Sequence, residues 1–199
     1  MKLALASKAL LILAACGASC AAEASTVWDE SINGDLSNDG LSPTGLLLAS
    51  GENIILGTTG NRGQGVDRDY FSVLVPDGAV LTSIRLLANT NVSGGASFIG
   101  LQAGPQLTVS PEGDGAQNML GYLHYGNDMI GQDLLPFLAR SFGGKLPSGS
   151  YSAWVQETGG PATYGFDLTV EAVPVPLPGA VVLLFSGLLG VGTLRRRRS

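Results

Sequence analysis

The sequence predicts an all-β fold, a jelly-roll-like antiparallel β-sandwich over residues 25–172. Short runs in which apolar and polar residues alternate recur roughly every ten residues, as they do in sandwich domains. Glycine and proline are frequent, with 29 and 10 of 199 residues, while charged residues make up 14%, and this mix favours turns over long helices. Period-two alternation gives each strand one buried and one wet face, as in antiparallel sheets.

The predicted strands follow one another along the chain. They cover residues 46–48, 53–58, 69–75, 80–88, 97–102, 119–125, 151–157 and 163–171. The third run is predicted to place Phe71, Val73 and Val75 on one face, and a Pro-Asp-Gly turn at 76–78 separates it from the fourth. The inward face of the fourth run is predicted to hold Val80, Thr82, Ile84, Leu86 and Ala88. The last run is the most regular, and its predicted inward face is Tyr164, Phe166, Leu168 and Val170.

Two segments depart from the strand pattern. Residues 130–144 are predicted to hold a short helix or an irregular crossover, because Pro136 excludes a long regular helix. The glycine-rich stretch at 57–71 lacks the Gly-Lys-Ser/Thr ending of a phosphate loop and leads into a strand instead of a helix. It is therefore interpreted as a mobile loop.

The charge balance of the body excludes nucleic acid as a partner. Residues 25–173 contain five basic and fifteen acidic side chains, a net charge of −10. A body this acidic is repelled by the phosphate backbone. No cofactor is expected from this composition, with Ca²⁺ as the one ligand that the acidic residues suggest.

The sequence predicts a protein that is not an enzyme. His124 is the only histidine, and no residue near it has the character of an activated nucleophile. A zinc site usually needs several histidine or cysteine ligands, which the body does not offer. His124 is interpreted as a strand residue between two tyrosines.

Two groups of side chains are candidate binding residues. Asp67 and Asp69 alternate at a strand entry, so their carboxylates project together and are a candidate Ca²⁺ site. The alternative is that these acids are solvated or paired with Arg62 or Arg68. The second group is aromatic, and it forms either a sugar-binding platform or part of the core. Its members are Trp28, Tyr151, Trp154 and Tyr164.

Residues 1–24 have the layout of a secretory signal peptide, which implies the Sec export machinery as a partner. Lys2 and Lys8 supply the basic start, a short apolar run follows, and Ala22-Glu23-Ala24 is the predicted cleavage site. The sequence Leu-Ala-Ala-Cys ending at Cys16 leaves open a lipoprotein signal, in which that cysteine is lipidated. Cleavage after residue 24 removes both cysteines of the chain, so burial alone stabilises the mature body.

The C-terminal end predicts a membrane anchor. Residues 173–178 form a proline-rich linker, and residues 179–194 carry no charge. A helix of that length spans roughly 24 Å, slightly less than a bilayer core. The basic residues of the tail at 195–199 keep that end cytoplasmic and the body outside.

This ending resembles the PEP-CTERM sorting signal. The resemblance rests on three ordered features: Pro176-Leu177-Pro178, a short transmembrane helix, and a basic cluster formed by Arg195, Arg196, Arg197 and Arg198. It implies a Gram-negative protein that is held transiently in the inner membrane and recognised by an exosortase. That enzyme would cut near the Pro-x-Pro motif and deliver the body to the cell surface or extracellular matrix. The family is associated with exopolysaccharide and biofilm formation.

The body is similar to bacterial pre-peptidase C-terminal domains, which are small β-sandwiches. The similarity lies in residues 67–86, 98–104, 133–138 and 151–170. Together the two resemblances imply a structural or adhesive role in an exopolysaccharide matrix, with the exosortase and exopolysaccharide as partners. The alternative is a carbohydrate- or Ca²⁺-binding module at the cell surface.

Overall fold

The computed structural model describes residues 24–61, 63, 65–110 and 115–174, and β-strands dominate this part of the chain. The strands are β1 (Ser25–Asp29), β2 (Thr44–Leu47), β3 (Gly51–Asn61), β4 (Val66–Leu86), β5 (Asn91–Val92), β6 (Ser97–Ala103), β7 (Gly121–Tyr125), β8 (Leu146–Gln156) and β9 (Ala162–Ala172). The all-β prediction is therefore confirmed.

The helical elements of the described residues are single turns. They are α1 (Glu30–Asn33), α2 (Leu135–Leu138) and the 3-10 turns η1 (Gly115–Asn118), η2 (Asn127–Met129) and η3 (Arg140–Phe142). The short helix predicted within residues 130–144 is confirmed by α2, whose first turn contains Pro136. Within the described residues, no helix has the length and apolar character needed to cross a bilayer.

The strands form one mixed sheet that folds over on itself. Its order is β1-β3-β9-β4-β8-β6-β7, with β2 paired to β4 and β5 paired to β9. The central pairings are antiparallel, as predicted, but β1 runs parallel to β3 and β2 runs parallel to β4. The expectation of a purely antiparallel sheet is therefore wrong at these two pairings, because the connecting segments carry the chain across the body instead of turning back beside the same strand.

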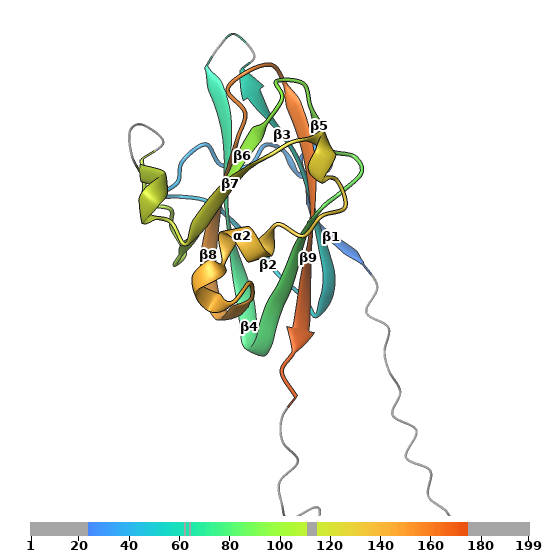
Figure 1. The fold of residues 1–199 in the computed structure, drawn as a ribbon, viewed down its shortest axis with the longest axis vertical. Helices are drawn as coiled ribbons and strands as arrows, with labels where there is room; N and C mark the ends of the chain where they lie inside the picture. The colour runs from blue at the N-terminus through green and yellow to red at the C-terminus, as the bar shows by residue number, and fades with distance from the viewer. Residues whose placement is uncertain (1–23, 62, 64, 111–114, 175–199) are drawn as a thin grey trace, which may run out of the picture.

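Strand β4 joins the two layers of the fold. Its first half pairs with β8 and its second half with β9, and the register shifts between Val75 and Val80. Figure 1 shows β4 bending at its lower end, so that its halves lie in different layers. The predicted Pro-Asp-Gly turn is this corner, where Gly78 has a φ of 72° that favours glycine. The backbone there stays in strand geometry, which makes the corner a bulge within one strand.

The core lies between the two layers. One layer contributes Phe71, Val73, Ile99, Leu101 and Ala153, while the other contributes Leu81, Ile84, Phe166 and Leu168. These side chains leave a void of only about 10 Å³ between them. The interior is therefore packed and offers no room for a ligand.

The predicted inward faces are confirmed for β9 and for the first half of β4, and are wrong for part of the second half of β4. In β9 the predicted residues are buried, with Phe166 fully so, and in β4 Phe71, Val73 and Val75 are buried. Beyond the corner, Leu81 is fully buried while Val80 and Thr82 are only half-buried, and Ala88, past the end of β4, is exposed. A register shift between Leu81 and Ser83 breaks the alternation that the sequence pattern assumes.

The glycine-rich stretch is mostly strand, so its interpretation as a mobile loop is wrong. Residues 57–61 belong to β3 and residues 66–71 to β4, and the two strands pair through Gly60 and Asp67. Gly57 is needed for close approach, because a Cβ atom there would overlap the hydroxyl group of Tyr164. The glycines of this stretch therefore serve close packing against β9 as well as the turn between β3 and β4.

Three predicted features lie outside the described residues. They are the signal peptide up to residue 23 with Cys16, the sorting motif Pro176-Leu177-Pro178, and the apolar segment 179–194 with its arginine cluster. Strand β1 begins at Ser25 and strand β9 ends at Ala172, so the described sheet occupies the stretch between them.

Candidate functional site

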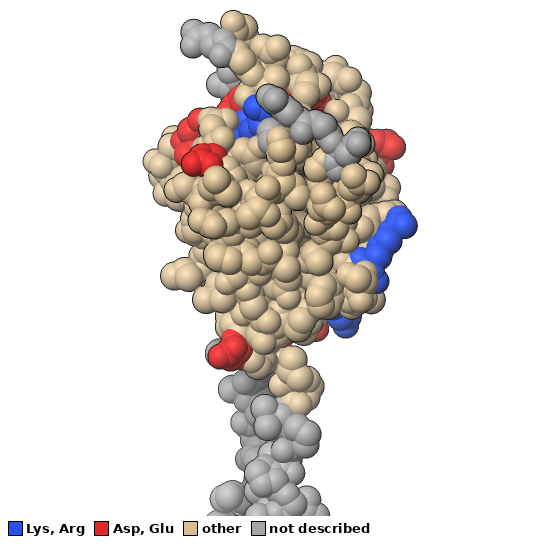
Figure 2. Space-filling view, turned by 90° about the vertical axis from the view of Figure 1, so that its left-hand side faces the viewer, with Lys and Arg blue, Asp and Glu red and all other residues tan. Residues whose placement is uncertain are grey.

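A wide polar cleft lies where β3 and β4 meet. It has a volume of about 1010 Å³ and is lined by Glu30, Ser31, Asp35, Asn38, Thr58, Gly60, Gly65, Val66, Asp67 and Arg68. Strand β9 starts near this end, since Thr59 pairs with Ala162, and it ends at the opposite pole. Figure 2 shows acidic side chains gathered toward the upper end of the molecule, above a face with little charge. The cleft is therefore polar and predominantly acidic.

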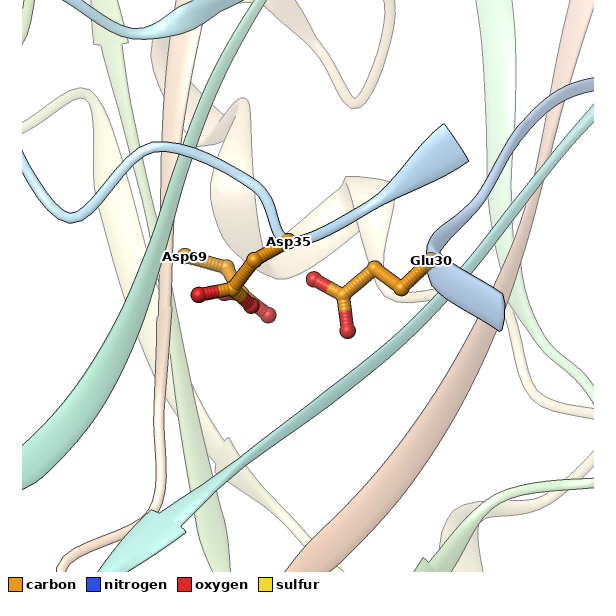
Figure 3. Close-up of side chains that lie close together, drawn as sticks. All are labelled: Glu30, Asp35 and Asp69. Atoms are coloured by element: carbon orange, nitrogen blue, oxygen red, sulfur yellow. The ribbon is translucent and has the colours of Figure 1, made fainter. Parts of the chain in front are cut away.

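Three carboxylates converge at this cleft. Glu30 is the first residue of α1, Asp35 lies in the loop that follows, and Asp69 lies within β4. One carboxylate oxygen of each lies within 4.8 Å of the others. Figure 3 shows the three side chains pointing toward one another from these separate segments. We call these residues the acidic triad.

Asp69 is the buried member of the acidic triad. It is 0% exposed, and its Oδ2 accepts a hydrogen bond of 2.7 Å from the hydroxyl group of Tyr164. Its Oδ1 is buried and has no hydrogen-bond partner. Burial, followed by the negative charge of Glu30, raises the pKa of Asp69 to about 8. The carboxyl group thus lies in surroundings that disfavour its charged form.

Glu30 is held in place by neutral donors. Its Oε1 accepts from the backbone N–H of Leu36 at 3.1 Å, and its Oε2 accepts from the backbone N–H and the hydroxyl group of Thr58 at 2.7 and 3.0 Å. Burial raises the pKa of Glu30, and these hydrogen bonds act in the opposite direction. Asp35 is exposed at the mouth of the group. Glu30 and Asp69 are therefore fixed, whereas Asp35 faces solvent.

Two neighbouring carboxyl groups with raised pKa values, here Glu30 and Asp69, are also found in sites of general acid–base catalysis. General acid–base chemistry requires the group to come within hydrogen-bond distance of a substrate atom. Asp69 has no exposed surface, so a sugar or peptide cannot reach it without rearrangement of β4. In this arrangement the carboxyl group of Asp69 therefore has no direct contact with a substrate of that size.

The structure places the predicted pair of aspartates on the same strand with different neighbours. Asp67 lines the cleft, whereas Asp69 lies deeper and joins Glu30 and Asp35. The Arg68 side chain instead donates from Nε to Gln156 Oε1 at 2.7 Å. Of the two predicted arginine partners, Arg68 is thus directed to Gln156, and Arg62 lies outside the described residues.

Sequence reasoning missed Glu30 and Asp35. A local signal exists, because Asp29 caps α1 by accepting from the backbone N–H of Ser31 at 2.9 Å. This signal predicts a helical turn and places Glu30 in it. It does not predict that the turn lies beside β4, since that contact depends on the parallel pairing of β1 with β3.

The aromatic residues predicted as platform or core belong to the packed interior. Tyr151, Trp154 and Tyr164 are 4%, 5% and 1% exposed, and Trp28 is partly buried against the core. The platform alternative is wrong, because Tyr151 and Tyr164 are buried in the main core and Trp154 is buried in a second cluster with Tyr70 and Leu107. His124 is exposed on β7, with its ring edge against Phe98 at a centroid distance of 5.6 Å.

No family model matches this chain, and no curated protein matches it. A functional hypothesis therefore depends on the patterns at the two ends of the sequence and on the geometry of the body.

Proposed function

We propose that this chain is an exported, non-enzymatic protein of the cell surface or extracellular matrix, with a jelly-roll-like body delivered through its C-terminal tail. The observation that carries the proposal is the ordered succession of Pro176-Leu177-Pro178, an uncharged segment at 179–194 and four arginines. The uncharged segment is long enough for a marginal membrane helix, and the arginines orient it. The signal-peptide pattern at residues 1–24 supports export by the Sec machinery.

The arrangement of the body fits display at a surface. Strand β9 has 11 residues, about 35 Å of extended chain, and leads from the cleft end to Ala172 at the opposite pole. A body held by a tail that follows Ala172 directs its acidic cleft away from the membrane. That orientation suits an adhesive or structural role toward exopolysaccharide or other matrix components.

The body chemistry supports a role without catalysis. His124 packs against Phe98 on an outer strand, and Asp69 is inaccessible to a substrate. The proposal therefore treats the chain as a substrate of a sorting enzyme of the exosortase type.

The experiment compares three forms of the chain expressed in the native host. These are the wild type, a form lacking residues 176–199, and the double variant Pro176→Ala/Pro178→Ala. We expect the wild type at the cell surface or in the matrix, the truncated form released as a folded soluble protein, and the double variant retained at the inner membrane with its arginines. Cell fractionation and the intact mass of each product give the readout.

A matched control replaces a proline outside the motif, Pro105→Ala, and should be sorted like the wild type. Unchanged surface delivery of the truncated form contradicts the proposal. A mature wild-type chain that retains Arg195–Arg198 identifies a permanent inner-membrane protein instead. The same mass reports whether the N-terminus begins at Ser25 or at a lipidated Cys16.

A further inference from the structure

We propose that Glu30, Asp35 and Asp69 bind one Ca²⁺ ion, which fastens the N-terminal segment 25–37 to strand β4. This inference goes beyond the proposed surface role and does not depend on export. It replaces the pair Asp67 and Asp69 suggested by the sequence with a different set of ligands.

The first support is the spacing of the oxygens. The ligand atoms of the acidic triad lie within 4.8 Å of one another. Two oxygens on one Ca²⁺ ion, each at 2.3–2.6 Å from it, can be up to about 5 Å apart. Three oxygens this close lie no more than about 2.8 Å from a common centre, so a small side-chain adjustment would let a single ion contact all three.

The second support is the unpartnered oxygen of Asp69. Buried side-chain oxygens nearly always have a hydrogen-bond partner. Asp69 is 0% exposed, and its Oδ1 has none, although its Oδ2 is bonded to Tyr164. Its carboxylate is directed toward those of Glu30 and Asp35 (Figure 3). A cation between the three would supply the partner that this oxygen lacks.

The donor set selects a hard cation. All three ligands are carboxylates, with no imidazole or thiolate among them, and such sites suit Ca²⁺ or Mg²⁺ rather than zinc or copper. Glu30 already accepts three hydrogen bonds, which limit how far its carboxylate can turn to fit an ion. Ca²⁺ tolerates irregular geometry and completes its shell with water from the open cleft, whereas Mg²⁺ demands a near-ideal octahedron.

The charges around Asp69 favour a cation. The described groups that act electrostatically on its carboxyl are Glu30, Asp67 and Asp35, all of them acidic. The adjacent Arg68 side chain is bonded to Gln156. Positive charge placed between the carboxylates would offset their mutual repulsion.

The ion would join segments that the chain connects only indirectly. Glu30 follows β1, Asp35 follows α1, and Asp69 lies in β4. Strand β1 is an edge strand held by a short parallel ladder to β3. Binding should therefore slow hydrogen exchange in segment 25–37 more than elsewhere in the sheet.

The test uses the full chain, purified in detergent and freed of metal with EDTA. Terbium(III) serves as a luminescent Ca²⁺ mimic, because the Tyr164 hydroxyl is 2.7 Å from Asp69 Oδ2 and its ring can sensitise an ion in the triad. We expect terbium emission that Ca²⁺ suppresses at a concentration at least about tenfold lower than Mg²⁺. Ca²⁺ should also raise the melting temperature.

Three variants locate the site. Asp35→Asn removes an exposed ligand without disturbing packing and should weaken binding at least about tenfold, and Asp69→Asn should abolish it. Asp77→Asn is the matched control, since Asp77 lies on the same strand at the opposite corner and is exposed. It should bind like the wild type.

The proposal is overturned if about 10 mM Ca²⁺ neither displaces terbium nor changes the melting temperature, since extracellular sites bind at roughly 10⁻⁴–10⁻³ M. It is also overturned if Asp35→Asn binds as tightly as Asp77→Asn. Loss of binding in Asp67→Asn with retention in Asp35→Asn would assign the ion to the Asp67 and Asp69 pair instead. Because the purified chain is tested, a failure of surface sorting leaves these results unaffected.

Discussion

Two buried polar side chains in neighbouring parts of the sandwich differ in how their hydrogen bonds are met. Asn53, on β3, is 0% exposed, accepts from the backbone N–H of Ala49 at 2.8 Å and donates to the carbonyls of Ala49, Gly51 and Leu168 at 2.9–3.0 Å. Asp69, on β4, is equally buried, carries a carboxyl group, and has one partner.

The two residues therefore differ in role: the hydrogen bonds of Asn53 are complete, whereas the carboxyl group of Asp69 has an oxygen that could accept a further partner. Asn53 is satisfied by its own chain, and it ties the β2–β3 turn to β9. Asp69 lies where the chain provides acidic neighbours and leaves one oxygen without a donor. Burial of an unsatisfied carboxyl lowers the stability of a fold unless something else stabilises it. The acidic triad is thus a place where the fold loses stability, as expected if it is the Ca²⁺ site proposed above.

Substitution at Asn53 should have the largest effect. Asn53→Ala leaves the groups that it binds without partners inside the protein, and we expect the free energy of unfolding to fall by about 4 kcal/mol. Urea denaturation measures the change. Asn118→Ala, at an exposed position in η1, should change the free energy by less than about 0.5 kcal/mol. If Asn53→Ala and Asn118→Ala lowered the free energy of unfolding equally, the buried hydrogen bonds of Asn53 would not stabilise the fold, and its contrast with Asp69 would be lost.

Substitution at Asp69 should act with the opposite sign in the absence of metal. The pKa of Asp69 is raised from 3.8 to about 8. Between these values the folded state holds a proton that the unfolded state lacks, so unfolding free energy falls as pH rises through about 8. Asp69→Asn has no charge and keeps an oxygen for Tyr164. In EDTA at pH 9 it should be more stable than the wild type by about 3 kcal/mol.

The pH series supplies the control for this prediction. The stability advantage of Asp69→Asn should shrink steadily toward pH 4, where the wild-type carboxyl becomes protonated in the unfolded state as well as in the folded state. An advantage that does not vary with pH would show that ionisation of Asp69 is not its cause.

Gly57→Ala tests the single hydrogen bond that Asp69 receives. A Cβ atom at this position would overlap the Tyr164 hydroxyl, so the tyrosine must move away from Asp69. We expect a loss of about 2 kcal/mol in unfolding free energy. Gly45→Ala is the control on β2, because its Cβ would lie 3.9 Å from Ser72 Oγ, an ordinary contact. Chemical denaturation of both variants should separate them clearly.

Thr59→Val should give the smallest change. Thr59 is 0% exposed and its hydroxyl group has no partner, so it resembles Asp69 without the charge. Removing that hydroxyl should raise the free energy of unfolding by about 1 kcal/mol. Thr82→Val is the comparison, since the Thr82 hydroxyl donates to the Thr169 carbonyl at 3.3 Å and its removal should bring no gain. A destabilised Thr59→Val would indicate that its hydroxyl is satisfied in solution.

Sequence alternation predicted the fold where strands are regular. The inward residues of β9 and of the first half of β4 could be read from period-two patterns, because each strand has one face against the core. The bulge after Leu81 and the parallel pairings of β1 and β2 could not, because they depend on how the layers meet. Gly57 and Gly60 led to the wrong prediction of a loop, because their packing also depends on how the layers meet.

The candidate site was only partly accessible to sequence reasoning. Asp69 stood out because it alternates with Asp67 at a strand entry. Its neighbours Glu30 and Asp35 come from a segment far away in the sequence and are brought to it by the pairing of β1 with β3. Convergence of this kind carries no local pattern, and only the tertiary structure reveals it.

The position of β9 has a mechanical consequence. It pairs with β3 over residues 162–170 on one side and with β4 over residues 166–172 on the other, and Val173 N–H extends the contact to the Gly78 carbonyl at 2.7 Å. A pull on the chain beyond Ala172, directed along the axis of β9, loads both ladders in shear. Their hydrogen bonds must then fail together and not one at a time. The strand next to the exit point is therefore the one best able to bear tension when the body is held from that end.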